Sequence, residues 1–486
     1  MIDNHEHTLD PADWTSFRAL GHQMLDDMFD YLQNVRERDV WKPVPDEVKK
    51  YLQQPIPEAE RDEAAVYGEF VAQILPHTMG NVHPRFWGWV MGNGTPIGIL
   101  ADMLAATMNP NMGGGDHVGY YVERQVLDWY KALMGFPQES SGLLTSGGSM
   151  ANLVGLTVAR NAKAQFDIRA DGLTNAPHRM IVYASPETHS SNQKAVEMLG
   201  LGHDALRYIP VNDEFQIDID ALEQAIAKDR AAGHFPFCII GNAGTVATGA
   251  IDDLNTLADI CQRENLWFHV DGAFGALVML APELRPLVAG IERADSLAFD
   301  LHKWIYLPFD VGCVLVKHRL EHYQAFSLSP DYLTHAERGL AAGPEWYSDY
   351  GVQLSRSFRA LKVWMSMQVH GAEKYGALIH QNVQQANYLK DLVDDNPQLE
   401  RTAPVPLNIV CFRFVDSGLS EDQLNELNAE LLIRLQESGA AIVSNSTLKG
   451  KYSLRASNTN HRTRQEDLHI LVDEVVKIGR QLVNEG

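Results

Sequence analysis

Residues 296–310, with the sequence SLAFDLHKWIYLPFD, place a lysine directly after a predicted strand. Residues 296–300 are typical of a buried strand, and the run GCVLVKH at 312–318 is typical of another. Lys303 lies between them, flanked by His302 and Trp304. A lysine is rarely buried, because the loss of its hydration is costly unless another group compensates. This lysine therefore needs a chemical reason for its position.

The composition is that of a globular protein with an acidic surface. A chain of 486 residues is too long for one typical core and predicts two or three structural units. With 40 Lys and Arg against 63 Asp and Glu, the net charge is −23. A charge of this sign argues against nucleic acid or an anionic membrane as the main partner, although it is also an ordinary solubility feature.

The cellular compartment is predicted from the cysteines and the N-terminus. The four cysteines are widely spaced and form no CxxC pair, which argues against a disulfide framework. The N-terminal residues are polar and acidic, unlike a secretory signal, and no apolar run has the length of a membrane span. We therefore expect a soluble, cytoplasmic protein.

Three segments with different patterns follow one another. Residues 1–85 have apolar residues at helical spacing interrupted by prolines, which predicts an arm that packs on the body or on a second subunit. Residues 86–370 alternate short apolar runs with helical segments, which predicts an α/β domain with a mostly parallel sheet covered on both faces. Residues 371–486 are predicted to form a smaller α+β domain. Ligands of parallel sheets bind at the carboxyl ends of the strands.

A glycine-rich turn at 145–149 precedes one predicted helix. Gly147 and Gly148 allow the backbone to approach a ligand closely, and Ser149 offers a hydroxyl at a helix N-terminus, where a phosphate is favoured. Most turns of this kind are only turns. The sequence is not a Walker motif, since no Gly-Lys-Ser/Thr follows.

Other strand ends carry an imidazole, a hydroxyl and a carboxylate. His189 follows one predicted strand, Thr245 follows another, and Asp271 ends the run LWFHVD. Taken singly, His189 is better interpreted as a capping or core histidine, and Asp271 is either a helix cap or a carboxylate that faces a buried cation. Metal binding fits poorly, because the histidines lack carboxylates at ligand spacing. An aspartate and a lysine beside a phosphate loop instead suit pyridoxal 5'-phosphate, a flat aldehyde with a pyridine ring and a phosphate.

The chain resembles the group II pyridoxal-phosphate-dependent amino-acid decarboxylases, the family of the aromatic-L-amino-acid, histidine, glutamate and cysteine-sulfinate decarboxylases. The resemblance lies in the segments HPRFWGW, SGGSMANL, SPETHSS, GNAGTVATGAID, HVDGAFG, DLHKW, SPDYL and SRSFRALKVW, between about residues 80 and 370. It implies the fold type I of pyridoxal-phosphate enzymes, a homodimer with active sites at the interface, and an amino-acid substrate.

The resemblance also implies a role for each site residue. Lys303 would hold the cofactor through a Schiff base and Asp271 would meet the pyridine nitrogen. His189 would stack on the ring, with Ala273 against its opposite face and Thr245 beside its substituents. The phosphate would contact Gly148, Ser149 and His302. Tyr332, in the long segment after residue 327, would donate a proton to the substrate's Cα.

One departure concerns Asp300, which stands where many relatives have asparagine. A carboxylate near a phosphate is repulsive, so we expect its side chain to point elsewhere or to bond to the backbone.

Ser355, at a position where relatives vary between glycine and serine, favours phenolic amino acids or histidine over tryptophan. Arg85 would pair with an acidic substrate, or else form a surface salt bridge.

Alternative functions remain open at this point. The order of expected substrates is an aromatic L-amino acid first and an acidic one (glutamate, aspartate or cysteine sulfinate) second. An aminotransferase or a carbon–carbon lyase would share the fold. A catalytically inactive scaffold protein is a further alternative, against which the intact set of Lys303, Asp271 and His189 argues.

Overall fold

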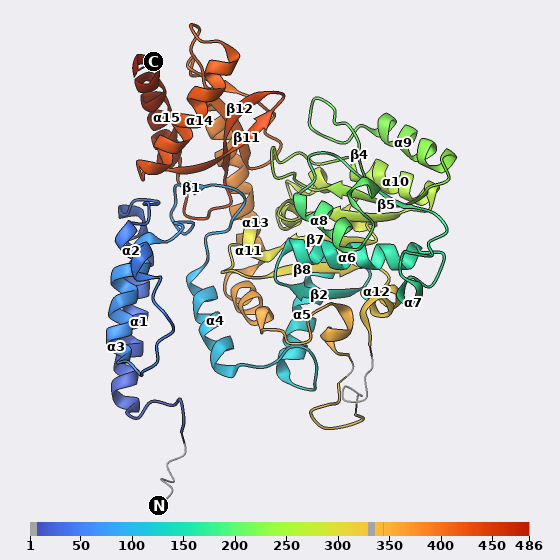
Figure 1. Cartoon of the computed structure of the whole chain (residues 1–486), viewed down its shortest axis with the longest axis horizontal. Coiled ribbons are helices and arrows are strands. Elements are labelled where there is room, and N and C mark those ends of the chain that lie inside the picture. The colour runs from blue at the N-terminus through green and yellow to red at the C-terminus, as the bar shows by residue number, and fades with distance from the viewer. Residues whose placement is uncertain (1–6, 329–335, 344, 486) are drawn as a thin grey trace, which may run out of the picture.

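The chain is described here from a computed structural model, which covers residues 7–328, 336–343 and 345–485. Its central feature is a seven-stranded sheet with the order β2-β8-β7-β6-β5-β3-β4 (Figure 1). The strands are β2 (Ser141–Thr145), β3 (Met180–Ala184), β4 (Leu206–Tyr208), β5 (Phe235–Asn242), β6 (Trp267–Asp271), β7 (Ser296–Asp300) and β8 (Gly312–Val316). Strands β4, β3, β5, β6 and β7 are parallel, and only β8 runs antiparallel to its neighbours β2 and β7. The predicted α/β fold with a mostly parallel sheet is confirmed.

Helices cover both faces of this sheet, as strand alternation requires. On β6, His269 and Asp271 hydrogen-bond to Asn152 of α6 (Gly148–Lys163), whereas Phe268, on the other face, lies with Leu257 of α10 (Leu254–Glu264) beside Gly241. The remaining helices of this part are α4 (Pro96–Met108), α5 (Val118–Leu133), α7 (Ile168–Asp171), α8 (Ser190–Met198), α9 (Ile219–Ala231), α11 (Leu301–Trp304) and α12 (Arg319–Phe326). The buried strands and the helices that flank them form one large core.

A second, five-stranded sheet has the order β1-β11-β12-β10-β9. Its strands are β1 (Phe86–Trp87), β9 (Leu399–Arg401), β10 (Ile409–Phe414), β11 (Ile442–Leu448) and β12 (Lys451–Ser457), and α14 (Glu421–Glu437) and α15 (Gln465–Glu485) pack on it. The long α13 (Arg359–Asp394) connects the two sheets and is broken at Gly371, whose φ is 71°. Since β1 pairs with β11, residues 86–87 belong to the small sheet, and the division at residues 85 and 370 stays a prediction.

The N-terminal arm consists of α1 (Trp14–Gln33), α2 (Asp46–Tyr51) and α3 (Glu63–Glu69) and lies along one side of the molecule, below the small sheet (Figure 1). No residue of α1 is buried, and Trp14, Phe17 and Met24 expose their side chains. The arm is attached near its centre by Arg36, which pairs with Asp467 at 2.8 Å. Its apolar face is thus left uncovered within the single chain.

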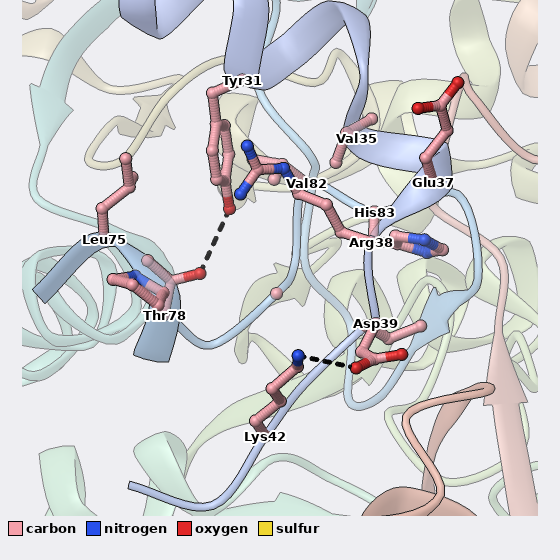
Figure 2. A pocket seen from close by; sticks show the side chains of 13 residues that line it. Tyr31, Val35, Glu37, Arg38, Asp39, Lys42, Leu75, Thr78, Val82 and His83 are labelled. Carbon is pink, nitrogen blue, oxygen red and sulfur yellow. Dashed lines mark hydrogen bonds and ion pairs between the residues drawn. The ribbon is translucent and has the colours of Figure 1, made fainter. Parts of the chain in front are cut away.

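A polar cavity of about 230 Å³ lies where the arm meets residues 75–83 (Figure 2). The guanidinium of Arg38 stacks 4.4 Å from the centre of the Tyr31 ring, and Lys42 pairs with Asp39 at 2.9 Å. The hydroxyls of Tyr31 and Thr78 are 3.3 Å apart. In this cavity Arg38 and Lys42 are engaged with Tyr31 and Asp39, and its lining includes none of the residues predicted at the strand ends. Among the described residues, no helix is both long and apolar enough to cross a bilayer.

Candidate active site

A cavity of about 190 Å³ at the carboxyl ends of the parallel strands brings together five of the predicted site residues. It is lined by Trp89, Val90, His189, Asn242, Gly244, Thr245, Val246, Asp271, Ala273, Phe274 and Lys303. Lys303 comes from the short helix α11 directly after β7, so the alternation of strand and loop delivers its amine to the sheet edge. The lysine, the aspartate and the histidine therefore share one site.

The carboxylate of Asp271 is buried and held by neutral donors. Its Oδ2 accepts hydrogen bonds from Nδ2 of Asn152 and Nδ2 of Asn192, each at 2.9 Å, and its Oδ1 accepts from the backbone N–H of Ala273 at 3.2 Å. No cation among the described residues pairs with this carboxylate. Its negative charge is therefore available to a protonated nitrogen in the cavity.

A second layer orients the amide of Asn152. The Oδ1 of Asn152 lies 3.0 Å from Nε2 of His269, and Nδ1 of His269 lies 2.8 Å from the hydroxyl of Ser296. Burial lowers the pKa of His269 to about 4, so the ring is neutral at neutral pH. We assign its proton to Nε2, which donates to Asn152, and this leaves the amide nitrogen of Asn152 directed at Asp271.

His189 lies at the N-terminus of α8, with its ring in the cavity. Its Nδ1 accepts a hydrogen bond from the backbone N–H of Ser191 at 3.2 Å, so the residue both caps the helix and faces the site. Burial is the main cause that lowers the pKa of His189, with Lys303 adding to it and Asp271 opposing it. A neutral, flat ring is suited to lie against another aromatic ring.

The turn that contains Thr245 is fixed by its own hydrogen bonds. The Thr245 hydroxyl accepts from the backbone N–H of Ala250 at 3.1 Å and lies 3.1 Å from the hydroxyl of Thr248. Thr245 is buried and lines the cavity after the end of β5.

The predicted phosphate residues lie beside the cavity rather than in its lining. Gly147 has a φ of 157° and precedes α6, whose first residue is Gly148, and Ser149 is exposed. His302 is buried, with Nδ1 donating to the Val311 carbonyl at 2.9 Å, and burial lowers its pKa. Nε2 of His302 takes no part in this hydrogen bond.

The strand that leads to this turn is held at the sheet edge by a buried ion pair. Arg356 and Glu123 are both fully buried, with Nη2 of the arginine 2.5 Å from Oε1 of the glutamate. Arg356 donates to the Leu144 carbonyl at 2.7 Å, and Glu123 accepts from the Leu144 N–H at 3.3 Å. Through these two hydrogen bonds the ion pair satisfies the backbone of β2 at the edge of the sheet, and this fixes the position of the glycine turn.

The expectation for Asp300 is wrong. Its carboxylate does not point away from the site: Oδ2 lies 2.9 Å from Nζ of Lys303, and a Cβ added at Gly148 would lie 2.7 Å from the same oxygen. The side chain is therefore directed at the glycine turn. The residue is short and stands at the end of β7, so that its Cβ direction is dictated by the strand.

Three further residues named from the sequence are not found among the described residues that line the cavity. Tyr332 lies outside the described residues. Ser355 is exposed and does not line the cavity. Arg85 donates from Nε to the Ala440 carbonyl at 2.6 Å, so it attaches the chain to the small sheet and does not face a substrate.

Sequence reasoning missed several polar residues around the site. Asn152 lies within the segment SGGSMANL and Asn192 directly follows the segment SPETHSS. They come one helical turn after Ser149 and His189, respectively, and this spacing was a usable signal. Arg455, on β12, donates to the Val246 carbonyl and from Nε to the Ser444 hydroxyl at 3.1 Å. It is buried without a carboxylate partner among the described residues, and nothing in its local sequence indicated this.

Comparisons with known proteins agree with this site. Residues 45–415 match the pyridoxal-dependent decarboxylase conserved domain. The chain is 35% identical over 455 residues to an aromatic-L-amino-acid decarboxylase of Bacillus atrophaeus, with 93% of each chain covered, and 29% identical over 482 residues to a histidine decarboxylase of Rattus norvegicus, with 95% and 70% covered. The crystal structure of Oryza sativa TDC with PLP and tryptamine superposes with a TM-score of 0.89 at 26% identity, covering 98% of this chain and all of that one.

The chain belongs to the pyridoxal-dependent decarboxylase family and is a pyridoxal-phosphate-dependent amino-acid decarboxylase of fold type I. The residues present fit the cofactor. Lys303 offers an amine, Asp271 offers a carboxylate with no cation of its own, and a glycine turn at a helix N-terminus offers a phosphate site. Among the described residues, no group of three or more His, Cys, Asp or Glu side chains is placed to hold a metal ion.

Proposed function

We propose that this enzyme decarboxylates an aromatic L-amino acid to the corresponding amine. The observation that carries the proposal is the cavity itself, whose lining combines Lys303, Asp271 and His189 with the apolar side chains of Trp89, Val90 and Phe274. An apolar, aromatic lining accommodates an aromatic side chain, whereas a carboxylate on the substrate's side chain would lack a partner there. Arg85, the cation considered for an acidic substrate, is engaged at the small sheet.

In this proposal, each residue around the cofactor has a separate task. When bound, pyridoxal phosphate supplies an electron sink for the electrons left by departing carbon dioxide. Lys303 would hold the cofactor through Nζ until the amino group of the substrate takes its place. Asp271 would keep a proton on the pyridine nitrogen, while the ring of His189 and the small side chain of Ala273 would lie against its two faces. Gly148, Ser149 and His302 contact the phosphate, and Thr245 contacts the ring substituents.

Arg455 is assigned to the carboxylate of the substrate. Its guanidinium is buried beside Val246, which lines the cavity, and burial lowers its pKa. A buried guanidinium without an anionic partner gains most from a carboxylate ligand, because the ligand supplies the missing charge. Holding the carboxylate also fixes the direction in which it leaves.

Tyr332 is assigned to proton delivery at the substrate's Cα. The assignment rests on the segment SPDYL and on the need for an acid after carbon dioxide has left. Tyr332→Phe should shift product from amine towards aldehyde and peroxide under air, with little change in KM. The three products are quantified from both enzymes, and an unchanged amine yield without peroxide would exclude this tyrosine.

A homodimer with active sites at the interface is proposed on the exposed apolar surface. The arm leaves Trp14, Phe17 and Met24 uncovered, and Trp89 in the cavity wall is 48% exposed. A second copy of the chain that covers both would complete the site. Deleting residues 1–75 should yield aggregates or lose the cofactor, as sedimentation and cofactor absorbance would measure.

A cytoplasmic location is also proposed. The four cysteines are free and buried, which suits a reducing compartment.

The substrate assignment is tested by measuring amine release from each amino acid in turn. We expect aromatic amino acids to give the highest kcat/KM. Release from glutamate, aspartate or cysteine sulfinate alone would overturn the aromatic assignment. A requirement for a keto-acid acceptor would replace decarboxylation by amino transfer.

A further inference from the structure

The environment of Asp300 differs from that of every other carboxylate at the site. The side chain is 2% exposed, and its Oδ1 has no hydrogen-bond partner among the described residues. Its Oδ2 lies 2.9 Å from Nζ of Lys303. A buried carboxylate with one unsatisfied oxygen is costly unless its charge is compensated, and here Lys303 provides the compensation.

The other charged or titratable groups that face this position offer no second cation. His302 of α11, His189 at the start of α8 and Cys313 of β8 interact with Asp300, and Asp271 and Glu123 interact in turn with His189 and Cys313. Burial lowers the pKa of both histidines and raises that of the Cys313 thiol, which keeps all three neutral. Glu123 is paired with Arg356, and Asp271 is held by amides. The charge of Asp300 therefore depends on Lys303 alone.

On the proposed function, Lys303 is the residue that bonds the cofactor, and Asp300 then loses its counter-charge. The bond to the cofactor removes the ammonium that Asp300 needs. At the same time a phosphate enters beside Gly147 and Gly148, and the carboxylate of Asp300 lies under these residues. Two anions would then adjoin in a buried site without a cation between them, which is strongly unfavourable.

We propose that Asp300 is the proton partner of Lys303: it accepts the ammonium proton when Lys303 bonds the cofactor, and it returns that proton when the substrate releases the lysine. In the first step, Lys303 –NH3+ gives one proton to Oδ2 of Asp300 and becomes –NH2. The amine adds to the aldehyde carbon, and its two hydrogens leave with the aldehyde oxygen as water, so that a carbon–nitrogen double bond remains. Asp300 is then a neutral acid that faces the phosphate without repulsion.

The return step uses the same proton. When the amino group of the substrate displaces Lys303, the freed amine takes the proton from Asp300 and the ion pair of the structure forms again. The lysine is thereby held at Asp300 as an ammonium ion while the substrate occupies the cofactor. The substrate enters this step with its amino group unprotonated, so its two hydrogens pass to Lys303 and the third proton of the lysine comes from Asp300.

Infrared difference spectroscopy of the cofactor-loaded minus the cofactor-free enzyme tests the proposal. Loading with pyridoxal 5'-phosphate should produce the carbonyl band of a protonated carboxylic acid, and the band should shift in heavy water and on labelling with 13C-aspartate. The band should be absent from Asp300→Asn. It should persist in the control Asp310→Asn, because Asp310 pairs with Arg359 at 2.9 Å and does not line the cavity. No band in the wild type, or a band that survives Asp300→Asn, would overturn the proposal.

Pyridoxamine 5'-phosphate separates the two possible sources of the proton. It carries the ring and the phosphate but no aldehyde, so Lys303 keeps its ammonium ion. We expect it to bind without producing the band. A band with this ligand would mean that the phosphate draws the proton from solvent, which would overturn the transfer from Lys303.

Failure of the site assignment is distinguished by borohydride reduction of the loaded wild type, followed by peptide mass analysis. Labelling of Lys303 without an infrared band refutes only the role of Asp300. Labelling elsewhere refutes the assignment of Lys303. Even if Asp300→Asn fails to load, the isotope-edited wild-type spectrum remains a test, because the absence of a protonated-aspartate band refutes the proposal.

Discussion

The two buried aspartates of the site, Asp271 and Asp300, are held in opposite ways. Asp271 receives three hydrogen bonds from neutral groups, two amides and a backbone N–H. Asp300 has one cation, Lys303, and an oxygen without a partner among the described residues. The first arrangement stabilises the negative charge of Asp271 throughout the reaction, because none of the donors takes part in the reaction. The second lets the charge disappear when the cation is consumed.

The difference shows how one site holds a permanent and a transient carboxylate. Amide donors stabilise the ionised form without competing for the ligand's proton, so Asp271 is suited to a constant electrostatic task. An ammonium ion is both a counter-charge and a proton source, so Asp300 is suited to a change of protonation state. The surroundings, and not the residue type, determine which role an aspartate can fill.

The largest expected effect comes from removing Lys303, the cation that pairs with Asp300. Lys303→Ala should abolish covalent cofactor attachment and turnover while the fold remains. It also leaves Asp300 without its cation, so we expect this variant to be less stable than Lys303→Met/Asp300→Asn, in which both charges are absent. Turnover, cofactor absorbance and denaturant midpoints measure these effects. Decarboxylation at the wild-type rate would refute the whole site assignment.

The permanent charge is tested by Asp271→Ala. Decarboxylation should fall by several orders of magnitude, since a pyridine nitrogen without its anionic partner is a poor electron sink, whereas Asp271→Glu should keep part of the activity. The comparison of kcat/KM among the three enzymes measures the effect. A loss smaller than tenfold, about 1.4 kcal/mol of barrier, would show that the ion pair does not form there.

The amide donors behind Asp271 should have smaller effects. Asn152→Ala and Asn192→Ala each remove one hydrogen bond to a buried carboxylate, and a hydrogen bond to a charged group contributes about 1.5–3 kcal/mol. Each variant should therefore lower kcat by about 10-fold or more. Gln193→Ala is the matched control, because Gln193 bonds Glu197 on the exposed face of α8. If the control loses as much activity as Asn192→Ala, the effect lies in the helix and not in Asp271.

The smallest effect concerns the histidines, including His269 behind Asp271. Burial lowers the pKa of His83, His269, His322 and His461 from 6.5 to about 4 in the folded chain. Between these values the unfolded chain binds more protons than the folded one, so the free energy of unfolding falls as the pH falls. Urea midpoints should be lower near pH ~5 than above pH ~7. Equal or higher midpoints near the lower pH would contradict the burial of these rings in neutral form.

The comparison of sequence with structure is clearest in the strands. The apolar runs that contain β3, β5, β6, β7 and β8 are recognisable in the sequence, because strands buried on both faces are apolar along their length. The order of the strands, and the antiparallel direction of β8, are not visible locally, since pairing depends on distant segments. The same is true of β1, which joins the small sheet across more than 350 residues.

The sequence by itself determined the residue types that serve chemistry and their place at strand ends: Lys303, Asp271, His189 and Thr245 could be named because a strand end delivers its side chain to one edge of the sheet. Only the tertiary structure decided the surroundings of these groups. The amides of Asn152 and Asn192 meet Asp271 from two helices, and Asp300 turns towards the glycine turn of a different strand. Hydrogen bonding and counter-charges act over a few ångströms in space, so they depend on which distant segments the folded chain brings into contact.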